Sequence, residues 1–202
     1  MASTNDINVY ELLFLVVQKY RDLETAVVTE LNCQKIKNIE KYTKQIVNSP
    51  FIKTVDNIWQ GSQDLLGLKK SKYWSYRAIQ LYKTLYNTVP QDKRALNNCG
   101  ENFVRDHVVP KKVHAVKLLE MSKRSDFTVA KLKEYLDKNY LISIITKVED
   151  GYFVANPARI AYPHSLKNSM PELENWDWAK GPLSRYHAVG ITISKGHYSS
   201  FL

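Results

Sequence analysis

The residues best suited to chemistry lie in one short stretch, from Arg105 to Lys112, which reads Arg-Asp-His-Val-Val-Pro-Lys-Lys. The imidazole of His107 can accept a proton from water near neutral pH. The carboxylate of Asp106 is a ligand that Mg²⁺ prefers, and cationic side chains are suited to contacting phosphates. The stretch therefore predicts hydrolysis of a phosphodiester bond. The alternative is a strand end whose histidine has no chemical role.

The backbone around this stretch is expected to be a short strand. Residues 103–109 are rich in β-branched and aromatic side chains, and Pro110 would end the strand. Successive side chains on a regular strand point to opposite faces of the sheet. Asp106 and His107 can therefore serve one site only if the strand ends or twists there, and the nearby proline favours that.

Positive charge is concentrated around the same stretch. The 202-residue chain carries a net charge of +9, and residues 69–147 hold 17 Lys and Arg against 7 Asp and Glu. The segments before and after are close to neutral. Such a basic band favours a polyanionic partner, most often nucleic acid. A solvated, lysine-rich surface is the alternative.

The first part of the chain is expected to be helical. Residues 6–47 contain neither Gly nor Pro, and apolar residues recur every three or four positions, which predicts one long helix or two helices broken near Asn32. Further helices are expected over residues 51–66 and 71–87. The aromatic and basic residues of 71–87 suit either a nucleic-acid-binding face or, more often, a core. The N-terminal helices would provide core packing, a homodimer contact or nucleic-acid docking.

The remainder is expected to mix helices and strands. Helices are predicted at residues 111–121 and up to about 138, a strand at 140–146, a helical turn from 147, and a last strand at 189–194. Four prolines between positions 157 and 182 indicate a loop-rich wrap. The fold class predicted is α+β, mainly α-helical. The expected division is a helical region at 1–96 and a catalytic region at 97–202, or one compact domain.

Over roughly residues 97–155 the sequence resembles the HNH, or ββα-metal, nuclease family. In that family the first strand ends in an Asp/Glu-His pair, often followed by two aliphatic residues and proline, as in residues 106–110. An asparagine commonly precedes the second strand, as Asn139 does here. That strand runs into a helix whose first turn offers a metal ligand. The resemblance implies an HNH-like ββα core with a helical insertion of about 30 residues.

The resemblance also implies roles for individual residues. His107 would be the general base, Asn139 the residue that positions its loop, and Asp106 and Asp150 the ligands of Mg²⁺ or Mn²⁺. Glu149 would replace Asp150 if the register shifts by one. Arg105, Lys111, Lys112 and Lys147 are the candidate nucleic-acid contacts. The second histidine and the zinc-binding cysteine pairs of many family members are absent from this sequence.

Other candidate residues carry weaker signals. Cys33 and Cys99 are far apart, which indicates neither a disulfide framework nor a zinc ribbon and favours a reducing, cytoplasmic setting. His114 is expected on a helix surface, and His164, His187 and His197 lack metal-ligand spacing. Arg185 and Tyr186 suit a phosphate clamp, but a structural tyrosine beside a surface arginine is favoured. We expect no transmembrane segment and no targeting segment.

These observations predict a divalent-metal-dependent endonuclease that hydrolyses phosphodiester bonds, of DNA rather than RNA, such as a restriction or phage-defence enzyme. Two other functions stay open. The chain would be a non-catalytic nucleic-acid-binding protein that uses its basic middle region, or a helical protein-interaction module.

Overall fold

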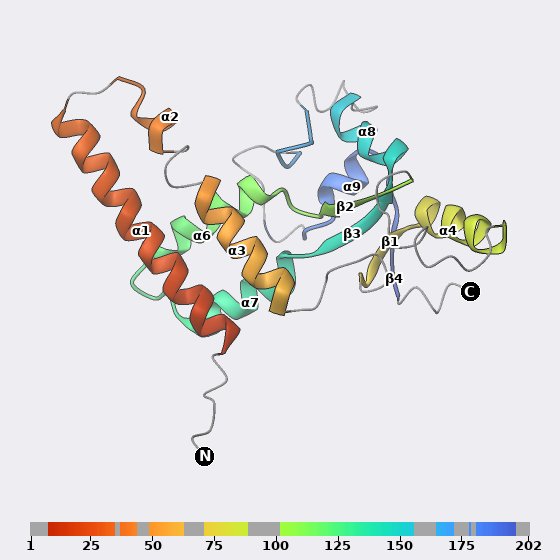
Figure 1. Cartoon of the computed structure of the whole chain (residues 1–202), viewed down its shortest axis with the longest axis horizontal. Coiled ribbons are helices and arrows are strands. Elements are labelled where there is room, and N and C mark those ends of the chain that lie inside the picture. The colour runs from red at the N-terminus through yellow and green to blue at the C-terminus, as the bar shows by residue number, and fades with distance from the viewer. Residues whose placement is uncertain are drawn as a thin grey trace, which may run out of the picture. The chain divides into compact units, whose positions relative to one another are not determined.

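The computed structural model describes residues 8–34, 37–43, 49–62, 71–88, 102–155, 165–171, 178 and 181–196. Over these residues the protein is α+β and mainly helical, with a four-stranded mixed sheet (Figure 1). The predicted fold class is confirmed at this level. The chain forms two compact units, residues 1–63 with 111–136 and residues 64–110 with 137–202. These units describe packing, and the functional division at residues 96 and 97 stays a prediction.

The first unit is helical. It contains α1 (Val9–Cys33), α2 (Ile39–Thr43), α3 (Ser49–Ser62), α6 (Lys111–Ser122) and most of α7 (Val129–Asn139). The end of α1 lies next to the break expected near Asn32. Pro50 lies in the first turn of α3, whereas it was expected only to end the helix before it. Proline is tolerated there because the backbone N–H groups of the first turn have no hydrogen-bond partner within the helix. Buried apolar side chains from α1, α3, α6 and α7 form the core, among them Leu13, Val17, Phe51, Trp59, Leu118 and Leu132.

The helical segment after Pro110 packs on the N-terminal helices. The ring centroids of Phe14 and Phe127 lie 5.0 Å apart, and Arg21 Nη1 donates a hydrogen bond of 3.1 Å to the carbonyl oxygen of Ser122. Lys123 and Glu24 form an ion pair of 2.7 Å. The segment expected as an insertion into a catalytic core therefore completes the helical unit.

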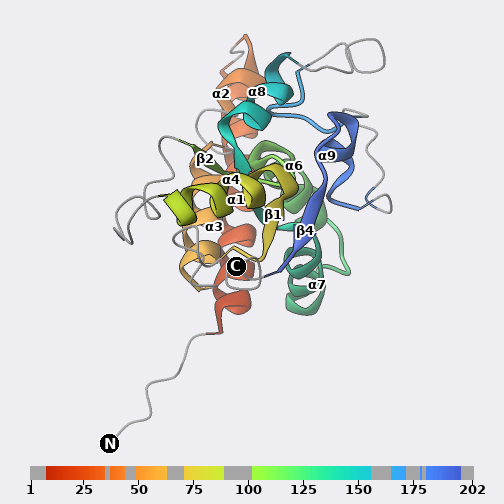
Figure 2. The same ribbon diagram turned by 90° about the vertical axis from the view of Figure 1, so that its right-hand side faces the viewer.

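The second unit is built on the sheet. Its strands are β1 (Tyr73–Ser75), β2 (Phe103–His107), β3 (Ile142–Thr146) and β4 (Ile193–Lys195), in the order β2-β3-β1-β4. β3 pairs antiparallel with β2 and parallel with β1. β4 lies antiparallel to β1, and these two strands are seen next to each other in Figure 2. The last three strands in chain order lie within predicted strand segments or overlap them. β1 was not predicted, because residues 71–87 were expected to form a single helix.

Each face of the sheet carries its own core. Ile144 packs with Trp74 and with buried residues of α4 (Tyr76–Thr88). The next residue, Ile145, packs with Phe153 of α8 (Lys147–Ala155) and Tyr186 of α9 (Ser184–Ala188). Since neighbouring side chains on a strand alternate, α4 covers one face while α8 and α9 cover the other.

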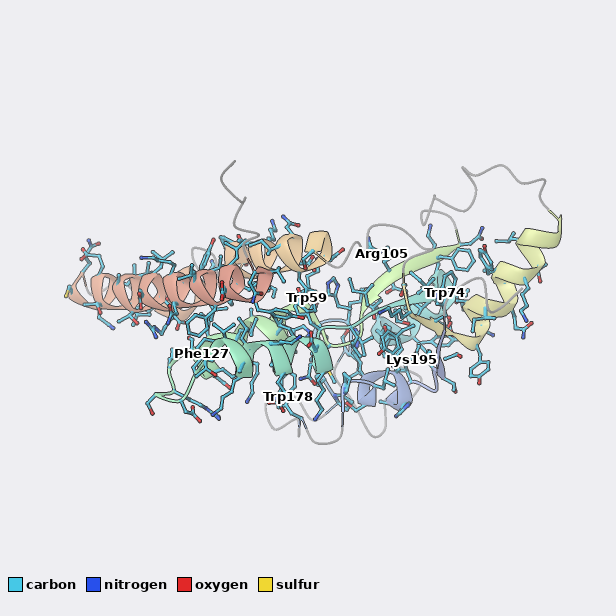
Figure 3. All side chains as sticks on the ribbon, turned by 90° about the horizontal axis from the view of Figure 1, so that it is seen from below. Trp59, Trp74, Arg105, Phe127, Trp178 and Lys195 are labelled. Atoms are coloured by element: carbon cyan, nitrogen blue, oxygen red, sulfur yellow. The ribbon has the colours of Figure 1, made fainter. Side chains whose placement is uncertain are left out.

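The aromatic residues of 71–87 divide between core and surface. Trp74, labelled in Figure 3, is fully buried, and its ring contacts those of Tyr82 and Phe103. Tyr76 is 56% exposed. The core interpretation therefore holds for Trp74 and Tyr82, and Tyr76 remains available to a ligand.

Parts of the predicted C-terminal wrap lie outside the described residues, namely 156–164, 172–177 and 179–180, and so do Cys99, His164 and His197. Among the described helices, none combines the length and the apolar character needed to cross a lipid bilayer.

Candidate active site at the end of strand β2

The two strands that carry the candidate site lie side by side. In the antiparallel β2/β3 pair, His107 is opposite Ile142 and Phe103 is opposite Thr146. Asn139 therefore lies three residues before the strand partner of His107. α8 starts directly after β3. Asp106 therefore lies on β2, and Asp150 lies on the helix that follows its partner strand β3.

The carboxylate of Asp106 is held by two neighbouring residues of α9. Arg185 Nη2 forms an ion pair with Asp106 Oδ2, and the hydroxyl of Tyr186 donates a hydrogen bond of 2.6 Å to the same oxygen. Burial raises the pKa of Tyr186 well above its usual value of 10, and the negative charge of Asp106 raises the pKa further. Tyr186 therefore stays protonated and acts as a donor.

Arg185 organises this part of the structure. Its side chain is completely buried, which corrects the expectation of a surface arginine. The guanidinium donates to the carbonyl oxygens of Val108 at 3.2 Å, His107 at 2.5 Å and Leu166 at 3.2 Å, and it lies 4.1 Å from the centre of the Phe153 ring. It thus ties the end of β2 to α9 and to the segment 165–167. With all these contacts inside the protein, Arg185 has a structural role.

Asp150 also has a cationic neighbour. Lys167 Nζ forms an ion pair with Asp150 Oδ1, and the Asp150 side chain is 25% exposed. Arg185 Nη1 lies 3.4 Å from the carbonyl oxygen of the same lysine. A continuous series of polar contacts therefore links Asp106, Arg185, Lys167 and Asp150. The sequence offered no motif that would identify Lys167 as part of it.

Glu149 stabilises the start of α8. Its Oε2 accepts hydrogen bonds of 2.9 Å from both the backbone N–H and the hydroxyl of Thr146, and the Thr146 hydroxyl accepts one from the Glu149 N–H. This reciprocal pattern is a capping box. Ser75 Oγ donates a third hydrogen bond of 2.7 Å to Oε2. The Thr-x-x-Glu spacing at 146–149 was a readable signal for this role, and it keeps Oε2 from binding a metal.

His107 lies on the other side of the strand from Asp106. The ladder continues beyond β2, because the N–H of Val108 donates to Leu141 O at 2.9 Å, so the strand stays regular at His107. The His107 ring packs edge-on against Tyr140, whereas Asp106 faces α9. β2 ends at His107 and the chain bends at Val108 and Val109. Asp106 and Val108 nevertheless both face α9, where each contacts Tyr186, so the His107 side chain between them points to the opposite face of the sheet.

The remaining candidate residues lie in both units. Asn139 is 5% exposed at the end of α7, and Lys147 is exposed at the first turn of α8. Arg105, labelled in Figure 3, is partly buried, and its strand partner is Ile144. In the first unit, Lys111 Nζ forms an ion pair of 2.6 Å with the buried carboxylate of Asp56, and Lys112 is exposed. Of the two lysines, Lys112 is thus the better placed for phosphate.

The predicted magnesium site has two carboxylates, those of Asp106 and Asp150. No group of three or more His, Cys, Asp or Glu suited to a metal lies together in the described part of the chain. Mg²⁺, however, is usually held by one or two carboxylates together with water and substrate phosphates. Asp106 and Asp150 each have one oxygen for which no hydrogen bond forms within the described residues. A zinc site, which takes three or four protein ligands, does not fit them.

His114, expected on a helix surface, is completely buried in the first unit. Its Nδ1 lies 2.7 Å from the hydroxyl of Tyr135, so the histidine is part of the helical core. The surface expectation was wrong because α6 has apolar neighbours on more than one side, which the spacing of its residues does not reveal.

Comparison with protein-family models, curated proteins and solved structures finds no match for the chain.

Proposed function

We propose that the protein is a divalent-metal-dependent nuclease with an HNH-like site formed by β2, β3 and α8. The observation that carries the proposal is the antiparallel β2/β3 pair running directly into α8, with Asp-His at the end of the first strand and Asp150 on the helix. This is the element order that the family resemblance implies. His107 takes a proton from the attacking water, as a histidine does near neutral pH.

The acidic residues have a separate role. Asp106 and Asp150 would hold Mg²⁺ or Mn²⁺, each through the oxygen that its cationic neighbour leaves available. A divalent cation bound there stabilises negative charge on the scissile phosphate. Asn139 positions the chain before β3, and Arg105 and Lys147 contact the flanking phosphates, with DNA as the substrate.

His107 and Asp106 point to opposite faces of the sheet, and the location of β2 would let both act on the same phosphate. Among the described strands β2 is at the edge of the sheet, with β3 as its one neighbour there. A phosphodiester chain that crosses this edge contacts side chains from both faces. The predicted cytoplasmic location, and a homodimer through the N-terminal helices, where Leu12, Leu15 and Leu23 are exposed on α1, belong to the same proposal.

A second candidate is a nucleic-acid-binding protein without catalysis. The pairing of Asp106 with Arg185 and of Asp150 with Lys167 favours it, since both carboxylates already have partners. The basic band would then bind phosphates, and His107 would be structural. Cleavage distinguishes the two functions.

The test is plasmid cleavage by the full chain with Mg²⁺ or Mn²⁺, with EDTA as the metal-free condition. The His107→Ala variant should lose at least about 100-fold in rate, the range expected for removal of a general base. His187→Ala is the matched control, because His187 is an exposed histidine of α9 in the same unit. Circular dichroism would establish that both variants fold.

Two results would reject the nuclease. One is an absence of cleavage by the wild-type protein with either metal, and the other is a His107→Ala rate equal to that of wild type. Salt-dependent DNA binding without cleavage would then support the second candidate.

A further inference from the structure

A pocket of about 300 Å³ opens in the second unit, lined by residues of α4, α8 and the chain leading into β4. The lining residues are Tyr76, Arg77, Glu149, Tyr152, Gly190 and Thr192. This volume is at the lower end of the range for small-molecule sites. The pocket therefore has room for a small ligand or a single group of a larger one.

Two tyrosines and an arginine supply the surfaces that a flat, anionic ligand needs. Tyr76 is 56% exposed, although it is a large aromatic side chain. Arg77 Nη1 donates a hydrogen bond of 2.5 Å to the Tyr152 hydroxyl, and the guanidinium carbon lies 6.0 Å from the centre of the same ring. A guanidinium has five N–H donors, so Arg77 keeps donors for a phosphate. Nucleobases stack on exposed aromatic rings of this kind.

Glu149 provides a hydrogen-bond acceptor in the pocket wall. The residue is only 4% exposed, and its three side-chain hydrogen bonds from Ser75 and Thr146 all reach Oε2. Within the described residues, Oε1 receives no hydrogen bond. An ionised carboxylate only accepts hydrogen bonds, so Oε1 of this pocket-lining residue can accept one from a ligand. A ligand with an N–H group can supply one.

We propose that this pocket binds one unpaired nucleobase that carries an exocyclic amino group, with its ring on Tyr76, its amino group on Glu149 Oε1 and its phosphate on Arg77. A carboxylate accepts such a hydrogen bond from the amino group of cytosine. Glu149 and Asp150 are consecutive on α8, so their side chains leave the helix about 100° apart, and the pocket is distinct from the Asp150 carboxylate. The inference rests on the proposed nucleic-acid substrate and adds a base-reading subsite.

The probes are the mononucleotides CMP and UMP, which carry an amino group and a carbonyl oxygen, respectively, at the same ring position. Their binding to the full chain is measured by calorimetry in EDTA, where no cleavage occurs. Wild type should bind CMP about tenfold more tightly than UMP, because only CMP donates to Oε1. Tyr76→Ala should weaken both nucleotides about tenfold through loss of stacking.

The Glu149→Gln variant gives the sharpest result. Glutamine keeps the capping box, so its carbonyl oxygen remains with Thr146 and its amide NH₂ points to the pocket. The preference should then invert, with UMP bound more tightly than CMP. If Glu149→Gln fails to fold, the wild-type preference and the Tyr76→Ala result still test the proposal.

Arg77→Ala and Lys83→Ala are a matched pair on α4, since each removes one positive charge and only Arg77 lines the pocket. Arg77→Ala should weaken CMP but not the uncharged nucleoside cytidine, and Lys83→Ala should change neither. Equal binding of CMP and UMP, or binding of neither, overturns the proposal even when plasmid is cleaved. The CMP preference without cleavage would reject the nuclease and leave the base site intact.

Discussion

The strongest prediction concerns Arg185, replaced by methionine. The change removes the cation that pairs with Asp106, and the Asp106 side chain is only 13% exposed. Methionine keeps an unbranched apolar side chain near Phe153 and Tyr186. Breaking a buried ion pair by removing one partner lowers the free energy of unfolding by about 3–5 kcal/mol, because the remaining charge stays buried. The carbonyl oxygens of Val108 and Leu166 lose a donor as well.

The assay is urea unfolding followed by circular dichroism. With a slope of about 2–3 kcal/mol per molar urea for a chain of this size, the midpoint of Arg185→Met should fall by about 1–2.5 M. The matched control is Arg77→Met, which removes an exposed arginine of the same unit and should change stability by less than about 1 kcal/mol.

A double variant tests the physical cause. Adding Asp106→Asn to Arg185→Met removes the unpaired charge, so the double variant should be more stable than Arg185→Met alone, with a coupling of about 1–3 kcal/mol. The reasoning is refuted if Arg185→Met unfolds within about 1 kcal/mol of wild type. It is also refuted if the double variant recovers no stability.

Two further predictions address pH and phosphate binding. The folded-state pKa of Tyr186 is raised, so its contribution to stability is present below pH 10 and is lost as pH rises from 10 towards the folded pKa, by about 1.4 kcal/mol per pH unit. In Tyr186→Phe this part of the alkaline loss should disappear from urea midpoints measured between pH 8 and 11.5, and an unchanged profile would contradict the assignment. Lys112→Ala should reduce the slope of log K for DNA against log salt by about 1, whereas Lys111→Ala should leave the slope unchanged because Asp56 holds its ammonium. Equal slopes for the two variants would show that the ion pair does not decide phosphate contact.

Local sequence patterns predicted most of the elements. The apolar spacing of α1 and α3 and the β-branched residues of β2 and β3 are signals carried by neighbouring residues, and the structure has elements there. The Asp-His pair at the end of a strand was readable in the same way. β1 was not, because Tyr73–Ser75 is three residues long and is a strand only through pairing with β3 and β4.

In the candidate site, too, some features follow from local sequence and others depend on distant residues. The capping box of Glu149 is encoded locally, because a threonine followed three residues later by a glutamate is the sequence signature of this cap. The burial of Arg185 was not encoded locally, since an arginine on a short helix is usually exposed. It is buried because Asp106, distant by 79 residues, and several carbonyl oxygens converge on it.

The sequence by itself determined most of the elements, the basic band and the order of the residues suited to phosphodiester chemistry, because these depend on residue type and short spacing. Only the tertiary structure decided that β2 and β3 pair, that Asp106 and His107 leave β2 on opposite faces, and that residues 111–136 complete the helical unit. These features depend on strand register and on which distant side chains share a core. Strand register and long-range burial depend on the free energy of contacts made across the whole fold, so no short stretch of sequence specifies them.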